Sequence, residues 1–490
     1  MQLARNSAFS VIQVLVSTTV LLLAYRQIST RLGLVELGIW SVVSAVAAVG
    51  RIADLGAGTA MVRLLPPILG KGDFATAGRL VVTAFSLVAI TLLVVLPVAF
   101  PLLIKLTGVV VADVHADLIR QLLALSLLSL MCNASGSCLL GTLEAMQRYD
   151  QRFVTVLIGN LVFLAMVLIL APTLGLVGLA VGVVAQAAIS LIVGWWYVRA
   201  GLRLGKWLPL GFHRQCARRV FATGGPLQGI TLANLAFEPT TRLLLAKFAG
   251  IEWAAIFDVA ERIVNQARSL LMAALQVSAP RFATIAADAR QEREGMYRLV
   301  YGLTWCLSVV GFGIVYAALP ALGTVALGTQ RPELLLLGAA LTIAWHLNTM
   351  SGPAYFSILG GGRLAWIVLA HVVLAMANIV LGLWWGAMFG APGVIGAFVV
   401  ALVIGSALNL IGHHKDFGYS VLPVSARDAM LAGGVAAVVA MATFAQMQSD
   451  SVMETYFYSA MFAIVLLAFG AWTMRPMLTV LWRDRMRHGE

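Results

Sequence analysis

Apolar and polar positions follow one another along this chain in long blocks. About fourteen apolar runs of roughly 20 residues, the length that crosses the hydrocarbon core of a bilayer, are separated by short polar links. The runs cover approximately residues 6–25, 37–62, 80–104, 121–143, 153–171, 175–198, 225–246, 253–279, 299–320, 334–358, 364–388, 391–411, 429–446 and 453–474. This pattern predicts an all-α polytopic membrane protein.

The later part of the chain also resembles the earlier part at a nearly constant interval. The stretch LGLVELGIWSVV at 32–43 is similar to FAGIEWAAIFDVA at 248–260. Further pairs are Arg79 with Arg298, Pro101 with Pro320, Asn160 with Asn378, Gly175 with Gly393 and Gly178 with Gly396. Each copy holds six apolar runs, an even number, so the copies share one orientation, as in transporters built from two parallel bundles.

We therefore expect two six-helix repeats that form a V-shaped pair of bundles, followed by two further helices. The expected divisions are an N-terminal bundle at 1–200, a cytoplasmic basic linker at 201–222, a C-terminal bundle at 223–412, the extra helix pair at 427–474 and a cytoplasmic tail at 475–490. Such symmetry predicts a substrate path between the bundles.

Composition supports the membrane assignment. The 490 residues are 61 % hydrophobic and 11 % charged, with a mean hydropathy of +0.93, which excludes an ordinary soluble domain. The net charge of +12 raises the question of a nucleic-acid partner, but Lys and Arg concentrate in alternate links, most densely at 199–219. That asymmetry is typical of cytoplasmic loops, so we expect both termini in the cytoplasm, membrane lipid as a partner of the basic links, and no nucleic acid.

Charged residues inside the apolar runs are the unusual feature of the sequence. DVAERIVNQARSLL, at 258–271, lies within a run, and at 3.6 residues per turn its polar side chains share one face. Similar stripes occur only in the first two runs of each half. The four arginines are Arg51, Arg242, Arg262 and Arg268, the four acids are Asp54, Glu238, Asp258 and Glu261, and the neutral members include Asn6, Gln13, Asn234 and Asn265.

An arginine facing lipid at this depth would cost about 2.5–3.5 kcal/mol, so these groups are expected to face protein or water. Ion pairs between residues four apart, Asp258 with Arg262 and Glu238 with Arg242, are a purely structural explanation. A hydrated cavity is the alternative. Because guanidinium groups bind phosphate through two parallel hydrogen bonds, arginines in such a cavity predict a phosphate-bearing cargo. The acids either set the arginine rotamers or take up protons, and both roles stay open.

The N-terminal pattern carries a family resemblance. ARNSAFSVIQVL, LGLVELGIWSVVSAVAAVGRIADLGAGTAMVRLLP and RLLLAKFAGIEWAAIFDVAERI resemble the polysaccharide-exporter branch, the O-antigen and exopolysaccharide flippases, of the multidrug/oligosaccharidyl-lipid/polysaccharide (MOP) flippase superfamily. The likeness extends over essentially the whole chain, including the final helix pair.

The resemblance implies a transporter and not an enzyme, with no cofactor and no metal. It implies that a polyprenyl-diphosphate-linked glycan moves from the inner to the outer leaflet of the bacterial inner membrane by alternating access, for O-antigen, capsule or exopolysaccharide assembly. Coupling to H⁺ or another cation, and contact with a polysaccharide polymerase or other assembly proteins, stay open. A monomer is expected.

Other functions fit parts of the same pattern. A multidrug or organic-cation antiporter of the superfamily would share the fold but would not need the arginines. A sugar polymerase or ligase would need a larger outer loop than the links near 105–120 and 320–333. A structural scaffold would not need charges at corresponding positions of two repeats.

Overall fold

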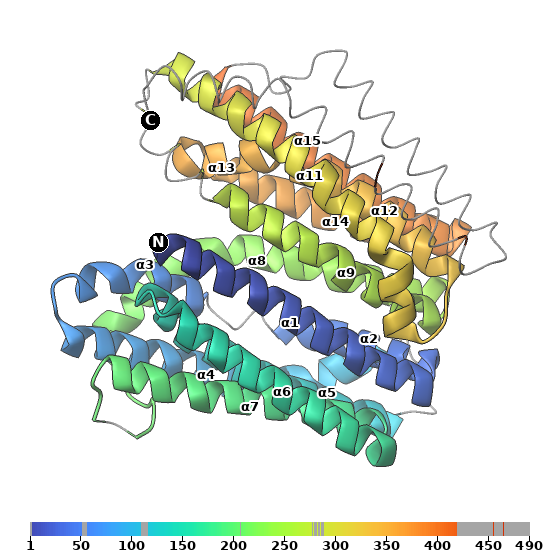
Figure 1. The fold of residues 1–490 in the computed structure, drawn as a ribbon, viewed down its shortest axis with the longest axis horizontal. Coiled ribbons are helices and arrows are strands. Elements are labelled where there is room, and N and C mark those ends of the chain that lie inside the picture. Colours follow the sequence, from blue (N-terminus) through green and yellow to red (C-terminus); the bar gives the residue numbers. More distant parts are fainter. Residues whose placement is uncertain are drawn as a thin grey trace. The chain divides into compact units, whose positions relative to one another are not determined.

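The computed structural model of the chain describes residues 2–50, 56–108, 116–205, 207–276 and 289–418, with single positions at 278, 282, 285, 454 and 464. Within these ranges the side chains of 2–11, 224–236, 273 and 276 are also outside the description. All regular elements of the described part are helices (Figure 1). The predicted runs at 429–446 and 453–474 lie outside the described residues, apart from positions 454 and 464.

Two compact units divide the chain, Met1–Ala255 and Ile256–Glu490. The helices of the first unit are α1 (Gln2–Arg31), α2 (Leu34–Ala48), α3 (Ala57–Leu69), α4 (Phe74–Gly108), α5 (Ala116–Ala145), α6 (Tyr149–Leu174), α7 (Leu176–Gly201) and α8 (Arg214–Phe248). In this unit α6 packs against α1 and α7, and α5 packs against α3, α4 and α7. Helix α9 (Ile251–Gln276) begins in the first unit and continues into the second.

The second unit contains the remaining described helices. They are α11 (Arg290–Leu327), α12 (Pro332–Thr349), α13 (Gly352–Gly361), α14 (Ala365–Phe389) and α15 (Ala391–Phe417). Here α15 packs against α12, α13 and α14, and α11 packs against α12 and α13. Each unit therefore has its own layer of neighbouring long helices.

The helices match the predicted runs closely. Every run from 6–25 to 391–411 contains a helix, and among the described residues nine helical stretches are long and apolar enough to cross a membrane. Two runs contain two helices each. Run 37–62 divides into α2 and α3, and α3 begins after Gly56, whose φ is 62°. Run 334–358 divides into α12 and α13, where Pro353 lies in the first turn of α13, a position at which proline favours a helix start.

The repeat is visible in the backbone of four glycines. Gly33, before α2, has φ 100°, and Gly250, before α9, has φ 104°. Gly175, between α6 and α7, has φ 59° and ψ −134°, while Gly390, between α14 and α15, has φ 63° and ψ −134°. These conformations are strained for residues with a Cβ. Equivalent turns therefore precede corresponding helices of the two repeats.

The equivalence of Gly175 and Gly390 corrects the repeat alignment expected from the sequence, which paired Gly175 with Gly393. A Cβ on Gly178 would lie 2.6 Å from the Leu170 carbonyl carbon and oxygen, and a Cβ on Gly393 would meet the Trp385 carbonyl in the same way. Leu170 and Trp385 also precede their respective glycines by the same number of positions. Gly178 is thus equivalent to Gly393. The predicted match of Gly178 with Gly396 is therefore wrong by three positions. The predicted match of Gly175 with Gly393 is wrong by the same amount, because Gly175 is equivalent to Gly390.

Candidate functional site

The central part of α9 is buried on all sides. Every residue from 254 to 261 is buried, and this stretch includes two carboxylates. Asp258 is 0 % exposed and Glu261 is 1 % exposed. Burying an ionised carboxylate without a partner is costly, so the helix has to supply compensating groups. Asp258 and Glu261 are therefore internal groups of α9.

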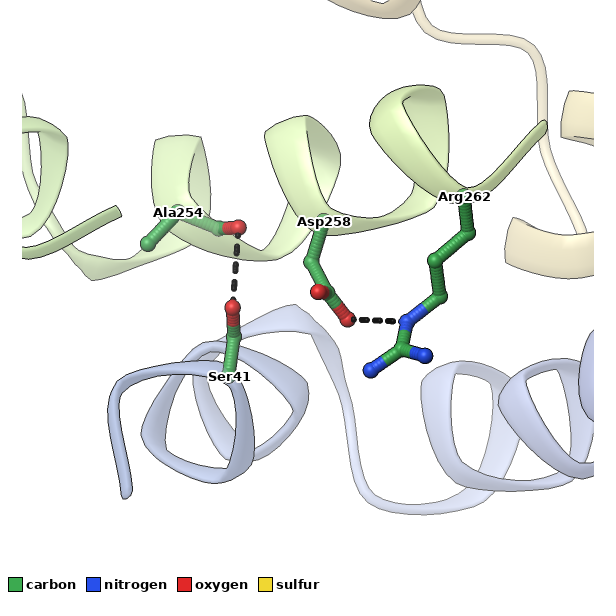
Figure 2. Close-up of polar contacts among 4 residues, drawn as sticks. All are labelled: Ser41, Ala254, Asp258 and Arg262. Carbon is green, nitrogen blue, oxygen red and sulfur yellow. Dashed lines mark hydrogen bonds and ion pairs between the residues drawn. The ribbon is translucent and has the colours of Figure 1, made fainter. Parts of the chain in front are cut away.

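Arg262 compensates Asp258 one helical turn further on. Its Nε donates to Asp258 Oδ2 at 3.0 Å, as Figure 2 shows, and its side chain is 33 % exposed whereas that of Asp258 is fully buried. Residues four apart on a helix lie on one face, which explains the pairing. The ion pair expected between Asp258 and Arg262 is confirmed. Its positive member is the one that reaches an accessible surface.

Arg268 is held by two neutral groups. Its Nη1 donates to Asn265 Oδ1 at 3.3 Å, and its guanidinium carbon lies 4.0 Å from the ring centroid of Trp345 in α12. A planar cation over an indole face is an attractive geometry, strongest where water is displaced. Arg268 itself is only partly buried. Helices α9 and α12 thus fix one arginine between an amide and an aromatic ring.

The Trp345 ring is fixed in turn by other aromatic side chains. Trp345 is 2 % exposed and meets the edge of Phe398 at 6.0 Å between centroids, and Phe398 meets Phe257 at 5.8 Å. Both contacts are edge-to-face, the arrangement that aromatic quadrupoles favour. The ladder joins α12, α15 and α9 and gives Arg268 a rigid support.

The first turns of α9 pack tightly on α2 within the first unit. Ser41 Oγ donates to the Ala254 carbonyl at 3.2 Å, and both groups appear in Figure 2. A Cβ at Gly38 would collide with the Ile251 carbonyl, so this close approach requires glycine. The contact positions the start of the helix that carries Asp258, Arg262 and Arg268.

Helix α8 carries two further residues of the predicted site, Glu238 and Arg242, both half-buried, beside the fully buried Thr241. The ion pair between Glu238 and Arg242, offered above as a purely structural explanation, stays a prediction. A spacing of four on a helix fixes only that two side chains can meet, and the rotamers that each environment favours decide whether they do.

The remaining residues of the predicted site are described only in part. Gln13 lies half-buried on α1, and Asn265 contacts Arg268 as described. Arg51 and Asp54, and the side chains of Asn6 and Asn234, lie outside the described residues. The structure thus brings together Asp258 with Arg262, and Asn265 with Arg268.

A neutral polar chain in the first unit was only partly foreseen. Gln186 Nε2 donates to Asn160 Oδ1 at 2.7 Å, and Asn160 Nδ2 donates to Ser17 Oγ at 2.7 Å, which links α7, α6 and α1. The stripe in the first run includes Ser17, and Asn160 belongs to the repeat. Nothing in the sequence pointed to Gln186, because it is a single amide in an apolar run.

The described residues contain no group of three or more His, Cys, Asp or Glu side chains that could hold a metal ion. The four cysteines are free, and three of them are buried. The arrangement on α9 offers accessible guanidinium groups on a buried acidic and aromatic support. Guanidinium groups of this kind can donate paired hydrogen bonds to an anion.

Comparison with known proteins places the chain. A family model described as "Polysaccharide biosynthesis protein" matches residues 3–286, more than half of the sequence. The chain belongs to this polysaccharide biosynthesis family. The matched region includes α1 to α9 and hence every residue of the predicted site. No curated protein sequence matches the chain.

Solved structures of MOP-superfamily transporters share the fold of this family member. The lipid II flippase MurJ in an inward closed conformation is similar with a TM-score of 0.71 at 13 % identity, covering 96 % of this chain and 99 % of MurJ. An inward-facing multidrug resistance MATE transporter has a TM-score of 0.65 at 14 % identity, covering 82 % and 94 %. A MOP-superfamily transporter from Pyrococcus furiosus has a TM-score of 0.57 at 13 % identity, covering 85 % and 95 %. The chain is a multi-pass membrane protein with the MOP-superfamily fold.

Proposed function

We propose that this protein is a flippase that moves a polyprenyl-diphosphate-linked oligosaccharide from the inner to the outer leaflet of the bacterial cytoplasmic membrane. The transport would proceed by alternating access and would serve O-antigen, capsule or exopolysaccharide assembly. Membership of the polysaccharide biosynthesis family and the likeness in fold to a lipid II flippase support the proposal.

One observation carries the choice of cargo. On α9 the carboxylate of the Asp258–Arg262 pair is fully buried, whereas its guanidinium is about one-third exposed. Arg268, the next arginine on the same helix, is also partly accessible and contacts Trp345 and Asn265. A ligand reaching this face therefore meets positive charge. Guanidinium groups stay protonated at any relevant pH and bind phosphate oxygens in pairs, which suits a diphosphate headgroup.

The same observation disfavours the second candidate, an antiporter of organic cations. Such a transporter needs a carboxylate that a cation can approach. On α9 neither acid is approachable, because Asp258 and Glu261 are 0 % and 1 % exposed and Arg262 covers the first of them. Among the described acids of the predicted site, only the half-buried Glu238 of α8 could serve such a transporter. In this proposal Asp258 is a positioning residue that sets the rotamer of Arg262, and the arginines contact the cargo.

The test is a flipping assay with the full chain in liposomes that contain a fluorescent polyprenyl-diphosphate glycan. Arg268→Gln and the Arg262→Gln/Arg268→Gln double variant should lower the flipping rate by about tenfold or more, because each charged hydrogen bond to phosphate is worth roughly 1.5–3 kcal/mol. Arg268→Lys should recover only part of the rate if paired hydrogen bonds matter.

Arg298→Gln is the matched control, since Arg298 is 62 % exposed, pairs with Glu294 and lies on α11 away from these contacts. It should flip at the normal rate. A double variant that inserts, folds and flips normally would overturn the proposal, as would preferential transport of organic cations by the unmodified chain.

A further inference from the structure

The linker between α7 and α8 is an ordered strap on the first unit. We define the strap as residues 202–213, of which all but 206 are described (Figure 1). Trp195 Nε1 of α7 donates to the Trp207 carbonyl at 2.7 Å. A hydroxyl of α4 binds the next segment: Ser86 Oγ donates to the Pro209 carbonyl at 3.3 Å and accepts from Gly211 N at 3.0 Å.

A fourth hydrogen bond completes the attachment. His213 N donates to Thr83 Oγ1 at 3.2 Å, and the Leu204 side chain fills the space above Gly78 so closely that a Cβ there would collide with it. Polar groups of the strap backbone are thus bonded to α4 and α7. The strap is held along one side of α4 from Gly78 to Ser86.

The outward side of the strap is strongly apolar. Trp207 is 80 % exposed, Leu208 64 %, Phe212 59 % and Leu210 55 %. Four large apolar side chains within six residues form a patch that a loop surrounded by water would not keep exposed. Because the backbone is tied to α4 and α7, these side chains cannot turn inward without breaking the four hydrogen bonds.

The position of the strap along α4 gives its depth in the membrane. Residues 80–104 carry no charge, and Arg79 is the last charged residue before this run. Thr83 and Ser86 lie four and seven residues beyond Arg79, or roughly 6 and 10 Å at about 1.5 Å per residue. The strap therefore lies at the boundary between headgroups and acyl chains, where tryptophan and other amphipathic side chains concentrate.

Positive charge surrounds the apolar patch. The Arg199 guanidinium carbon lies 4.5 Å from the Trp207 ring centroid. Four more arginines of the strap and the start of α8 are exposed, and none forms an ion pair with a described residue: Arg203, Arg214, Arg218 and Arg219. The sequence has no Asp or Glu between residues 151 and 237. No acid of this segment can neutralise the arginines.

We propose that the strap and its flanking arginines form a binding site for anionic phospholipid headgroups at the basic side of the membrane. The apolar side chains would enter the acyl region while Arg203, Arg214, Arg218 and Arg219 bind lipid phosphates. Apolar insertion and cationic attraction to anionic lipid are the two contributions that anchor interfacial segments. The site would fix the first unit at a defined depth through the segment that connects it to α8.

The test uses the full chain in bilayers of phosphatidylcholine with about one-quarter phosphatidylglycerol, extracted in polymer discs that retain the neighbouring lipid. The measured quantity is the ratio of phosphatidylglycerol to phosphatidylcholine in the discs relative to the bulk bilayer. The unmodified chain should enrich phosphatidylglycerol by about threefold, and Arg214→Gln/Arg218→Gln should lose most of that enrichment.

Arg63→Gln/Lys71→Gln is the matched control. It removes the same charge from two exposed residues near the α3–α4 link, which has no comparable apolar patch. This variant should keep the enrichment. Equal losses in the two variants would mean diffuse attraction to all basic residues and would overturn the site.

A second variant tests the apolar contribution separately. Trp207→Ser/Phe212→Ser keeps every arginine and should also reduce enrichment. Because the chain has 12 tryptophans, the contribution of Trp207 is the tryptophan fluorescence of the unmodified chain minus that of a Trp207→Phe variant, and lipids brominated near the carbonyl should quench this difference. If the serine variant enriches phosphatidylglycerol normally, or if brominated lipid does not quench Trp207 in the unmodified chain, the strap does not lie in the interface. Binding of a protein at this patch in place of lipid would give that same result.

Discussion

Helices α2 and α9 occupy equivalent places in the two repeats and handle buried polarity differently. The glycines that precede them, Gly33 and Gly250, share a φ near 100° and make Ser41 equivalent to Asp258. Both side chains are 0 % exposed. Ser41 donates a single neutral hydrogen bond to a carbonyl, whereas Asp258 holds a guanidinium. At this pair of equivalent positions, α9 thus carries a charge and α2 carries a neutral hydroxyl.

The difference indicates that the two equivalent helices have different roles: α2 packs closely, and α9 holds a buried ion pair. A serine and a glycine allow α2 to approach the backbone of α9, which needs no charge. The aspartate on α9 costs burial free energy that Arg262 offsets, and it is retained together with accessible arginines.

Giving α2 the acid of α9 should have the largest effect on stability. Ser41→Asp places a carboxylate at a fully buried position that faces the Ala254 carbonyl, and it should destabilise the protein by about 3–5 kcal/mol. Ser41→Ala should cost about 1 kcal/mol for the lost hydrogen bond. Thermal unfolding in detergent measures both. Tolerance of Ser41→Asp equal to that of Ser41→Ala would show that the two positions are not distinguished by charge.

The Asp258–Arg262 pair gives the next largest effect. Arg262→Gln should destabilise by about 1–3 kcal/mol, less than for a fully buried pair because the arginine is one-third exposed. Adding Asp258→Asn should restore part of the loss, since it removes the buried charge. A double-mutant cycle on unfolding temperature measures the coupling. Strictly additive losses would contradict a direct ion pair.

Trp345 should have the smallest effect and act through Arg268. Trp345→Leu removes the ring beneath the guanidinium and should weaken the apparent affinity for the lipid-linked cargo by about threefold to tenfold, as expected for a partly desolvated cation–π contact. Trp345→Phe should be intermediate. Trp384→Leu, at a 59 % exposed position in the same unit, is the control. A loss of the same size in the control would remove the assigned role of Trp345.

Hydrophobic run lengths were sufficient to predict the helices but not their interruptions. Membrane helices tolerate proline, so Pro353 within an apolar run does not by itself predict a break. The repeat register was ambiguous for a related reason. Gly390, Gly393 and Gly396 recur every three residues, so Gly175 and Gly178 match either adjacent pair, and only the positive φ of Gly390 selects the register.

The sequence predicted which charged residues lie on α9 but not which other side chains they contact. Helical spacing correctly placed Asp258 beside Arg262. Trp345 is distant from Arg268 in the sequence and belongs to no motif, so its contact depends on how α9 and α12 pack. Burial was also hidden from the sequence, because the stripe did not show that Asp258 and Glu261 on α9 are buried while Arg262 and Arg268 on the same helix are partly accessible.

The most direct measurement compares the affinity of the full chain for a polyprenyl diphosphate with that for the matching polyprenol. The unmodified protein should prefer the diphosphate by about tenfold or more, and Arg268→Gln should lose most of this preference while binding the polyprenol unchanged. An Arg268→Gln variant that is folded and keeps the full preference for the diphosphate would contradict the account.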